Sequence, residues 1–133
     1  VWSQTHIAGT NVDDYAKSVG IEFTNKDKAE IAELTKSSGA QIIKLKGATY
    51  NGIAVSVSTL AQSLLKDEHT IRPVCSMMNG EYGITGCSMN IPTIIGANGV
   101  EKVLEVPLYE EELFALQHSA KNLIAAIEGV KDL

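Results

Sequence analysis

The residues best placed to form a ligand site lie in one short stretch between two predicted helices. It reads Lys44-Leu45-Lys46-Gly47-Ala48-Thr49-Tyr50-Asn51-Gly52-Ile53-Ala54. Gly47 can adopt the left-handed conformation that ends many helices, and lysines in the preceding turn suit the helix dipole. Thr49 then stands where its hydroxyl could cap the next helix. Two helix ends that meet at a small hydroxyl side chain predict either a simple cap or the wall of a binding pocket.

The other residue types that could do chemistry form no complete catalytic set in the sequence. His6 falls in a predicted strand, and His118 lies off the apolar stripe of the last predicted helix, which predicts an exposed side chain. No histidine has a carboxylate partner that the sequence identifies, and no activated nucleophile is visible. The residues alone therefore predict no catalytic centre.

The two cysteines bear on redox state and on metal binding. Cys75 and Cys87 lie six residues on either side of Glu81, the centre of a predicted hairpin turn. Simple register would place them opposite each other, but disulfide geometry is demanding, so we expect two reduced, half-buried thiols. Few cysteines indicate a reducing compartment such as the cytoplasm. No Cys-x-x-Cys pair or histidine cluster supplies four zinc ligands, so no metal site is predicted.

Composition excludes some classes of function. The 133 residues are 44% hydrophobic and 20% charged, and the formal net charge is −5. These values are typical of one globular domain. No cluster of Lys and Arg offers a phosphate-binding surface, and the apolar runs are shorter than a membrane span, so neither nucleic acid nor a membrane is an expected partner. Val1 is not a methionine, which suggests that a preceding portion of a longer protein is missing.

Hydrophobic periodicity predicts an α+β fold in which long helices pack an antiparallel sheet. The predicted helices run from Thr24-Asn25 to about Lys46, from Tyr50 to Lys66 and from Tyr109 to Gly129. The predicted strands are Ile71 to Met78, Ile84 to Ile91 and Val100 to Val106, joined by tight turns into a meander, with a further interrupted strand in residues 1–12. Strands and helices do not alternate and no Gly-x-Gly-x-x-Gly motif is present, so no dinucleotide-binding half is predicted.

The same periodicity predicts which side chains form the core. Apolar residues recur at helical spacing through the second long helix, which we expect to be well buried. We expect Met77, Met78 and Met89 to fill the core beside the predicted strands.

The stretch around Thr49 also resembles part of the bacterial L-lactate dehydrogenases. Gly47-Ala48-Thr49-Tyr50 followed by Gly52-Ile53-Ala54 is similar to the GATxxGIA segment of that family, and Val1-Trp2-Ser3-Gln4 is similar to the stretch that follows its catalytic histidine. The similarity continues through residues 79–83, 91–96 and 98–100 and covers essentially the whole chain. It implies that residues 1–133 form a single C-terminal, substrate-side domain of a lactate/malate dehydrogenase, without the N-terminal dinucleotide-binding domain.

The resemblance carries expectations about chemistry. In that family a hydride passes between NAD and the C2 carbon of pyruvate or lactate, with help from a histidine, an aspartate and an arginine. Those three residues would precede Val1, so this chain is expected to hold no catalytic residue. Thr49 is expected to line the substrate pocket and Ile53 to pack against the nicotinamide ring. The resemblance further implies a small 2-oxo or 2-hydroxy acid as substrate and a cytoplasmic homo-oligomer, either a dimer or a tetramer.

Two alternatives stay open at this point. Lactate dehydrogenases commonly carry a tyrosine where this chain has Ala40. The missing ring could widen or reshape the pocket for a bulkier 2-oxo acid. Malate or another L-2-hydroxy acid also stays possible, because the family's lid residue that decides this is expected before Val1, although the Gly-Ala-Thr-Tyr string favours lactate. The second alternative is an isolated folding or assembly fragment without catalysis, and residues 1–133 alone are expected to be inactive.

Overall fold

The computed structural model describes residues 1–130, which form two compact units. One unit, here called the N-terminal unit, consists of residues 4–59 with Trp2. The other, here called the sheet unit, extends from Leu60 onward and includes Val1 and Ser3. The expected domain of residues 1–133 therefore includes three residues, 131–133, that lie outside the described part.

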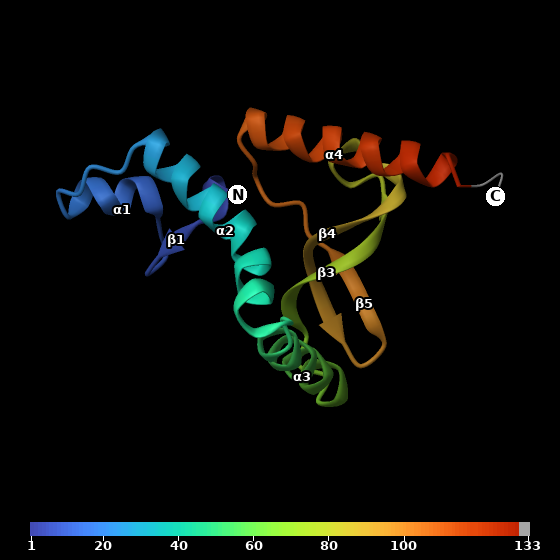
Figure 1. The fold of residues 1–133 in the computed structure, drawn as a ribbon. Coiled ribbons are helices and arrows are strands. Elements are labelled where there is room, and N and C mark those ends of the chain that lie inside the picture. Colours follow the sequence, from blue (N-terminus) through green and yellow to red (C-terminus); the bar gives the residue numbers. More distant parts are fainter. Residues whose placement is uncertain (131–133) are drawn as a thin grey trace. The chain divides into compact units, whose positions relative to one another are not determined.

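The N-terminal unit begins with a small hairpin and not with the single interrupted strand that we predicted. After a 3-10 helix, Trp2–Gln4, strands β1 (His6–Ile7) and β2 (Thr10–Asn11) pair antiparallel. Ala8 and Gly9 have φ angles of 51° and 83°, so the chain reverses where the sequence suggested only a kink. Helices α1 (Val12–Ser18) and α2 (Asn25–Lys46) follow (Figure 1).

Local chemistry explains both ends of α2. The Thr24 hydroxyl accepts a hydrogen bond from the Asp27 backbone N–H at 3.3 Å, and the Thr24 N–H donates to the Asp27 carboxylate at 2.7 Å. This capping box satisfies two N–H groups that a helix start leaves without partners, and it confirms the predicted start. At the other end Gly47 has a φ of 83° and its N–H donates to the Ile43 carbonyl at 2.8 Å, as the glycine turn predicted.

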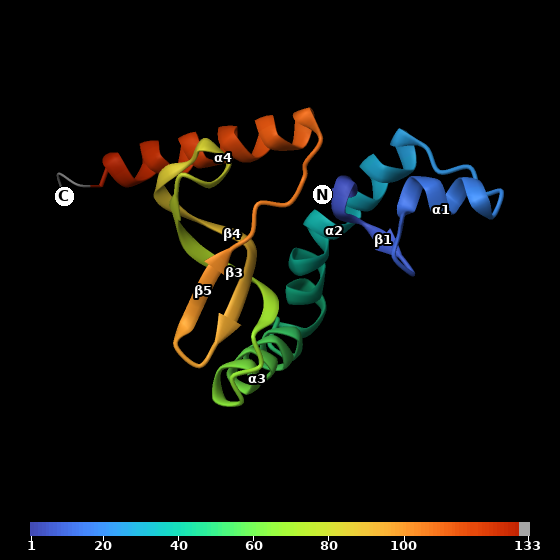
Figure 2. The same ribbon diagram turned by 180° about the vertical axis from the view of Figure 1, so that it is seen from behind.

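Helix α3 (Asn51–Leu65) leads to the sheet unit, which contains β3 (Thr70–Asn79), β4 (Thr85–Gly96), β5 (Gly99–Val103) and helix α4 (Glu110–Glu128). The strands are antiparallel in the order β3-β4-β5, which confirms the predicted meander (Figure 2). Pro73 lies on β3, which is an edge strand of this sheet. Strand β4 continues through Pro92, opposite Pro73, where we expected it to end near Ile91. The α+β class with an antiparallel sheet and long helices is confirmed.

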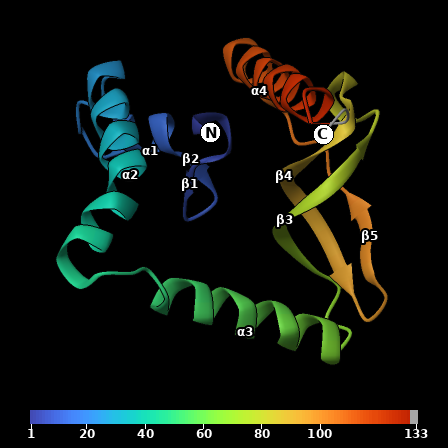
Figure 3. The same cartoon turned by 45° about the vertical axis from the view of Figure 1, so that its right-hand side comes forward.

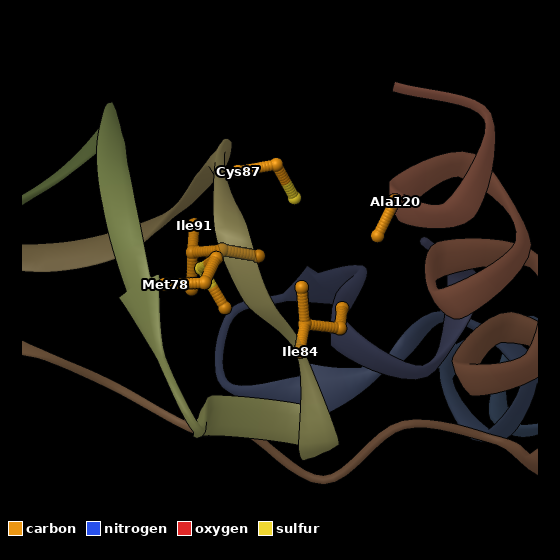
Figure 4. Packing of buried hydrophobic residues seen from close by; sticks show 5 residues of the cluster. All are labelled: Met78, Ile84, Cys87, Ile91 and Ala120. Atoms are coloured by element: carbon orange, nitrogen blue, oxygen red, sulfur yellow. The ribbon is translucent and has the colours of Figure 1, made fainter. Parts of the chain in front are cut away.

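The core of the sheet unit lies between the sheet and α4. Met78, Ile84, Cys87, Ile91 and Ala120 are at most 4% exposed and point toward one another (Figure 4). Met89 is partly buried against them, as predicted. The prediction for Met77 is wrong, because its side chain is 56% exposed. Neighbouring strand residues point to opposite faces, so Met77 and Met78 cannot both enter one core.

The cysteines are free, but their predicted positions are wrong. Cys75 lies opposite Asn90 and not opposite Cys87, and the register shifts between Met77 and Asn79. Cys75 is exposed and Cys87 is buried, so neither thiol is half-buried. The predicted opposition assumed a symmetric hairpin, whereas an irregular connection sets the actual register.

The burial predicted for α3 is also wrong within this chain. Ile53 is 61% exposed and Val57 is 60% exposed, and Ser63 is the buried residue that α3 contributes. A hydrophobic stripe shows which side of a helix avoids water but does not supply the surface that covers it. None of the helices in residues 1–130 is long and apolar enough to cross a membrane.

Candidate functional site

The candidate site lies where α2 ends and α3 begins. Gly47 turns the chain at the end of α2, residues 48–50 are not helical, and α3 starts at Asn51 (Figure 3). A hollow of about 590 Å³ lies at this junction, within the N-terminal unit. Its lining residues are Ile42, Lys46, Thr49, Tyr50, Asn51, Gly52, Ile53 and Ser56. The structure therefore brings both residues singled out from the sequence, Thr49 and Ile53, to one hollow.

Thr49 is not a helix cap. Helix α3 begins at Asn51, so Tyr50 is the flanking residue and Thr49 lies one position further out. In the described part of the chain the Thr49 side chain has no hydrogen-bond partner, and the residue is exposed. The predicted cap is therefore wrong, because the link between the helices is one residue longer than a cap at Thr49 needs. A hydroxyl that serves no helix is available to donate to, or accept from, a ligand.

Ile53 lies in the first turn of α3, four residues after Thr49, and lines the same hollow. Its side chain is 61% exposed in the lining of the hollow. Ile42 of α2 is 43% exposed and lines the same hollow. A hydroxyl next to an open apolar surface suits a ligand with a polar group beside a flat, apolar one.

Lys46 was not singled out as a ligand-binding residue in the sequence. Its Nζ lies 4.3 Å from the centroid of the Tyr50 ring, a cation–π contact. Among the lining residues Lys46 is the one with a charged side chain. In the sequence, Lys46 is a lysine in the last turn of a predicted helix. The helix dipole explains a lysine at that position without a role in ligand binding.

Ala40 is not among the residues that line this hollow. The substitution at this position therefore has no visible effect on the hollow within the described chain. The suggestion that Ala40 widens the pocket remains a prediction.

A second group of chemically active side chains lies in the sheet unit. His69 Nδ1 is 2.8 Å from Glu101 Oε2, and His69 Nε2 is 3.4 Å from Asp67 Oδ1. The hydrogen bond with Glu101, followed by the charge of Asp67, raises the pKa of His69 above its usual value. Asp67 also accepts a hydrogen bond from the Ala97 N–H at 2.7 Å. The sequence identified no carboxylate partner for any histidine, whereas the structure places two carboxylates beside His69.

The three side chains could in principle reach one metal ion, since one ligand atom from each lies within 4.8 Å of the others. However, both ring nitrogens of His69 already face a carboxylate. A protonated imidazole donates from both nitrogens and accepts from neither, so this geometry suits an imidazolium held between two carboxylates. We describe the group as an ion-pair cluster.

A larger hollow, of about 790 Å³, lies against β3 and β5. Its charged lining residues are Glu81, Glu101, Lys102 and Glu105. Within residues 1–130, three carboxylates against one ammonium disfavour an anionic ligand in this hollow, whereas the hollow at Thr49 is lined by one cation and no acid. The smaller hollow is therefore the better candidate for an acid substrate.

Comparisons with known proteins place these features in a family. Residues 1–133 match the family described as lactate/malate dehydrogenase, alpha/beta C-terminal domain. The chain is 42% identical to L-lactate dehydrogenase 2 of Clostridium acetobutylicum over 132 residues, which are 97% of this chain and 40% of that protein. It is 35% identical to the L-lactate dehydrogenase of Thermoanaerobacterium saccharolyticum, over 96% of this chain and 41% of that protein.

Solved structures agree with the sequence relatives. An L-lactate dehydrogenase from Clostridium thermocellum is 44% identical, with a TM-score of 0.80 over 98% of this chain and 42% of that one. The ligand-bound minor L-lactate dehydrogenase from Enterococcus mundtii is 28% identical, with a TM-score of 0.90 over 98% of this chain and 41% of that one. The chain thus spans about two fifths of the length of the proteins that it matches.

Proposed function

On the premise that the chain belongs to the lactate/malate dehydrogenase C-terminal domain family, we propose that it forms the substrate-side part of an NAD-dependent L-lactate dehydrogenase. The observation that carries this proposal is the hollow at the α2–α3 junction. It joins Thr49, whose hydroxyl has no hydrogen-bond partner among residues 1–130, to an exposed apolar side chain, Ile53. Relatives named L-lactate dehydrogenase cover nearly the whole chain and support lactate over other acids.

Thr49 and Ile53 have different parts in this proposal. The Thr49 hydroxyl donates a hydrogen bond to an oxygen of a 2-oxo acid or accepts one from a 2-hydroxy acid. Ile53 presents its apolar side chain to the face of the nicotinamide ring and excludes water there. NAD, when bound, accepts or supplies the hydride. The exposed side chain of Ile53, four residues after Thr49, fits a flat ring that lies beside the substrate.

The remaining parts of the reaction need residues from outside this chain. In the described part of the chain the hollow is lined by no histidine, aspartate or arginine. We therefore assign proton transfer, and the arginine that the resemblance implies for the substrate carboxylate, to the rest of the longer protein. Residues 1–133 form the C-terminal domain of that protein in this proposal, and the free thiols are consistent with a reducing compartment such as the cytoplasm.

Exposed apolar side chains support assembly with further protein surface. They include Leu34, Ile43, Ile53, Val55, Val57 and Leu65, which are 51–87% exposed. Many exposed apolar side chains on two helices are costly in water and suggest that another protein surface covers them. We propose that α2 and α3 pack against the rest of the longer protein and against other subunits of a homo-oligomer.

The test is NADH oxidation by the longer protein with pyruvate, and separately with oxaloacetate. We expect turnover with both substrates to favour pyruvate, and we expect residues 1–133 alone to be inactive. A preference for oxaloacetate would replace lactate by malate as the product. Turnover by residues 1–133 alone would show that the missing residues are not needed. No turnover of any 2-oxo acid by the longer protein would favour the alternative of a non-catalytic assembly module.

A further inference from the structure

We propose that Lys46 is a specificity-determining residue of the α2–α3 hollow, whose ammonium group draws the carboxylate of an anionic substrate toward Thr49. This inference rests on the proposed function, because it concerns the same hollow. It adds a residue and an electrostatic role that neither the sequence motifs nor the comparisons assign.

The first argument is the position of the ammonium group. Lys46 is the last residue of α2, and Gly47 ends the helix directly after it with a φ of 83°. The Lys46 Nζ lies 4.3 Å from the centroid of the Tyr50 ring, and both residues line the hollow. Contact with the ring restrains the ammonium at the edge of the hollow, while the exposed residue keeps it accessible to an anion.

The second argument is the sign of the charge around the hollow. Among the residues that the structure describes, Lys46 is the one charged residue that lines the hollow. The first turn of α3 contains no acidic residue that would neutralise the positive helix end. By contrast, the first turn of α4 contains three glutamates. The hollow is thus a positive site on a chain whose formal net charge is −5. A local positive potential raises the concentration and the association rate of anionic ligands.

A simpler role for Lys46 has to be distinguished from this one. A lysine in the last turn of a helix stabilises the negative end of the helix dipole. Lys44 lies in the same last turn of α2 but does not line the hollow. A change of Lys44 therefore removes one positive charge from the same helix end and leaves the hollow unchanged, which makes it a matched control.

The experiment uses the longer protein that contains this chain and compares the variants K46Q, K46R and K44Q. Initial rates of NADH oxidation with pyruvate are measured from about 20 mM to about 300 mM KCl, which spans strong and weak screening. We expect K46Q to raise KM for pyruvate about three- to tenfold at low salt, with kcat changed less than about twofold. We expect the difference between K46Q and the wild type to shrink as salt rises.

The controls separate the possible outcomes. K46R should keep the wild-type KM because it keeps the charge, and K44Q should match the wild type. The KM of the wild type for pyruvate should itself rise with salt, and this measurement needs no variant. An unchanged KM in K46Q, an equal effect of K44Q, or a salt-independent effect would overturn the role of Lys46 while leaving the proposed function intact. A wild type that does not reduce pyruvate would overturn both.

Discussion

At the residue scale, the main result concerns Thr49. A small polar residue after a glycine turn has an obvious local use as a helix cap, but the start of α3 at Asn51 removes that use. The hydroxyl is left exposed in the wall of a hollow. A side chain that does nothing for local structure, at a position shared with a family motif, is a good candidate for contact with substrate.

Replacement of Thr49 tests this contact directly. We expect T49V in the longer protein to lower kcat/KM for pyruvate by about two- to tenfold, because a lost hydrogen bond costs about 0.5–1.5 kcal/mol. T49S keeps the hydroxyl and should retain most of the activity. T35V is the matched control, since the Thr35 hydroxyl donates within α2 to the Ile31 carbonyl and does not line the hollow. Equal losses in T49V and T35V would contradict a role in substrate binding.

At the element scale, short-range chemistry sets where α2 starts and stops. The capping box of Thr24 and Asp27 opens the helix, and the bond from the Thr24 side chain lowers the pKa of Asp27. Gly47 closes the helix in the left-handed region. The position of the hollow depends on this closing turn, because it determines where α3 begins.

Two glycines of this segment should respond to alanine in opposite ways. Gly47 has a φ of 83°, which strains any residue with a Cβ atom, so G47A should destabilise the protein by about 1 kcal/mol. Gly39 lies inside α2, and a Cβ atom there would meet nothing within 4 Å. G39A should therefore stabilise the protein by about 0.5–1 kcal/mol. Denaturant unfolding of both variants checks the signs, and shifts in the same direction would contradict the geometry.

The ion-pair cluster of Asp67, His69 and Glu101 connects the segment after α3 to β5. Its stabilisation depends on the charge of His69, whose folded-state pKa is raised. The contribution is therefore fully present below the unfolded pKa of about 6.5 and is lost as pH rises through the folded pKa. We expect H69Q to lower the melting temperature more at about pH 6 than at about pH 8.5.

Titration of the His69 ring by NMR measures the same effect without unfolding. The pKa of His69 should lie above its usual value in the wild type, and E101Q should lower it, because Glu101 supplies the largest cause of the shift. E111Q, on the first turn of α4, is the control for general loss of negative charge. An E101Q variant with the wild-type titration curve would show that the cluster does not form in solution.

At the scale of the whole molecule, burial is uneven. The five side chains of the main core all belong to the sheet unit. Among the described residues of the N-terminal unit, Ala16 is the one buried hydrophobic residue. Helix α2 contains no buried residue. A partly buried pair, Lys28 and Asp13 at 2.7 Å, supports that unit instead. The chain spans about two fifths of the length of its relatives. If the rest of the longer protein covers α2 and α3, these helices should have few buried side chains in this chain alone.

A core substitution tests this distribution. I91A should destabilise the sheet unit by about 2–5 kcal/mol, since Ile91 is 4% exposed in the main core. V55A is the matched control, because Val55 is 68% exposed and loses little burial within the chain. Hydrogen exchange resolved along the chain would report both effects. In the longer protein, a large effect of V55A would indicate that α3 is covered there, as the proposed assembly requires.

The sequence by itself determined the features that depend on short-range interactions. The start of α2 follows from Thr24 and Asp27, which are close enough along the chain to bond to each other in any helix start. The meander follows from alternating apolar residues and the turns between them. The end of α2 follows from Gly47. Each of these signals is complete within a few neighbouring residues.

Only the tertiary structure decided which distant residues meet. Glu101 lies 32 positions beyond His69, and their pairing depends on the register of β4 and β5, which composition does not encode. The same reason explains the failed predictions for Cys75, Cys87 and α3, because strand register and the surface that covers a helix are non-local. For Thr49 the sequence indicated a site, and the folded junction of α2 and α3 showed that its hydroxyl is open to a ligand.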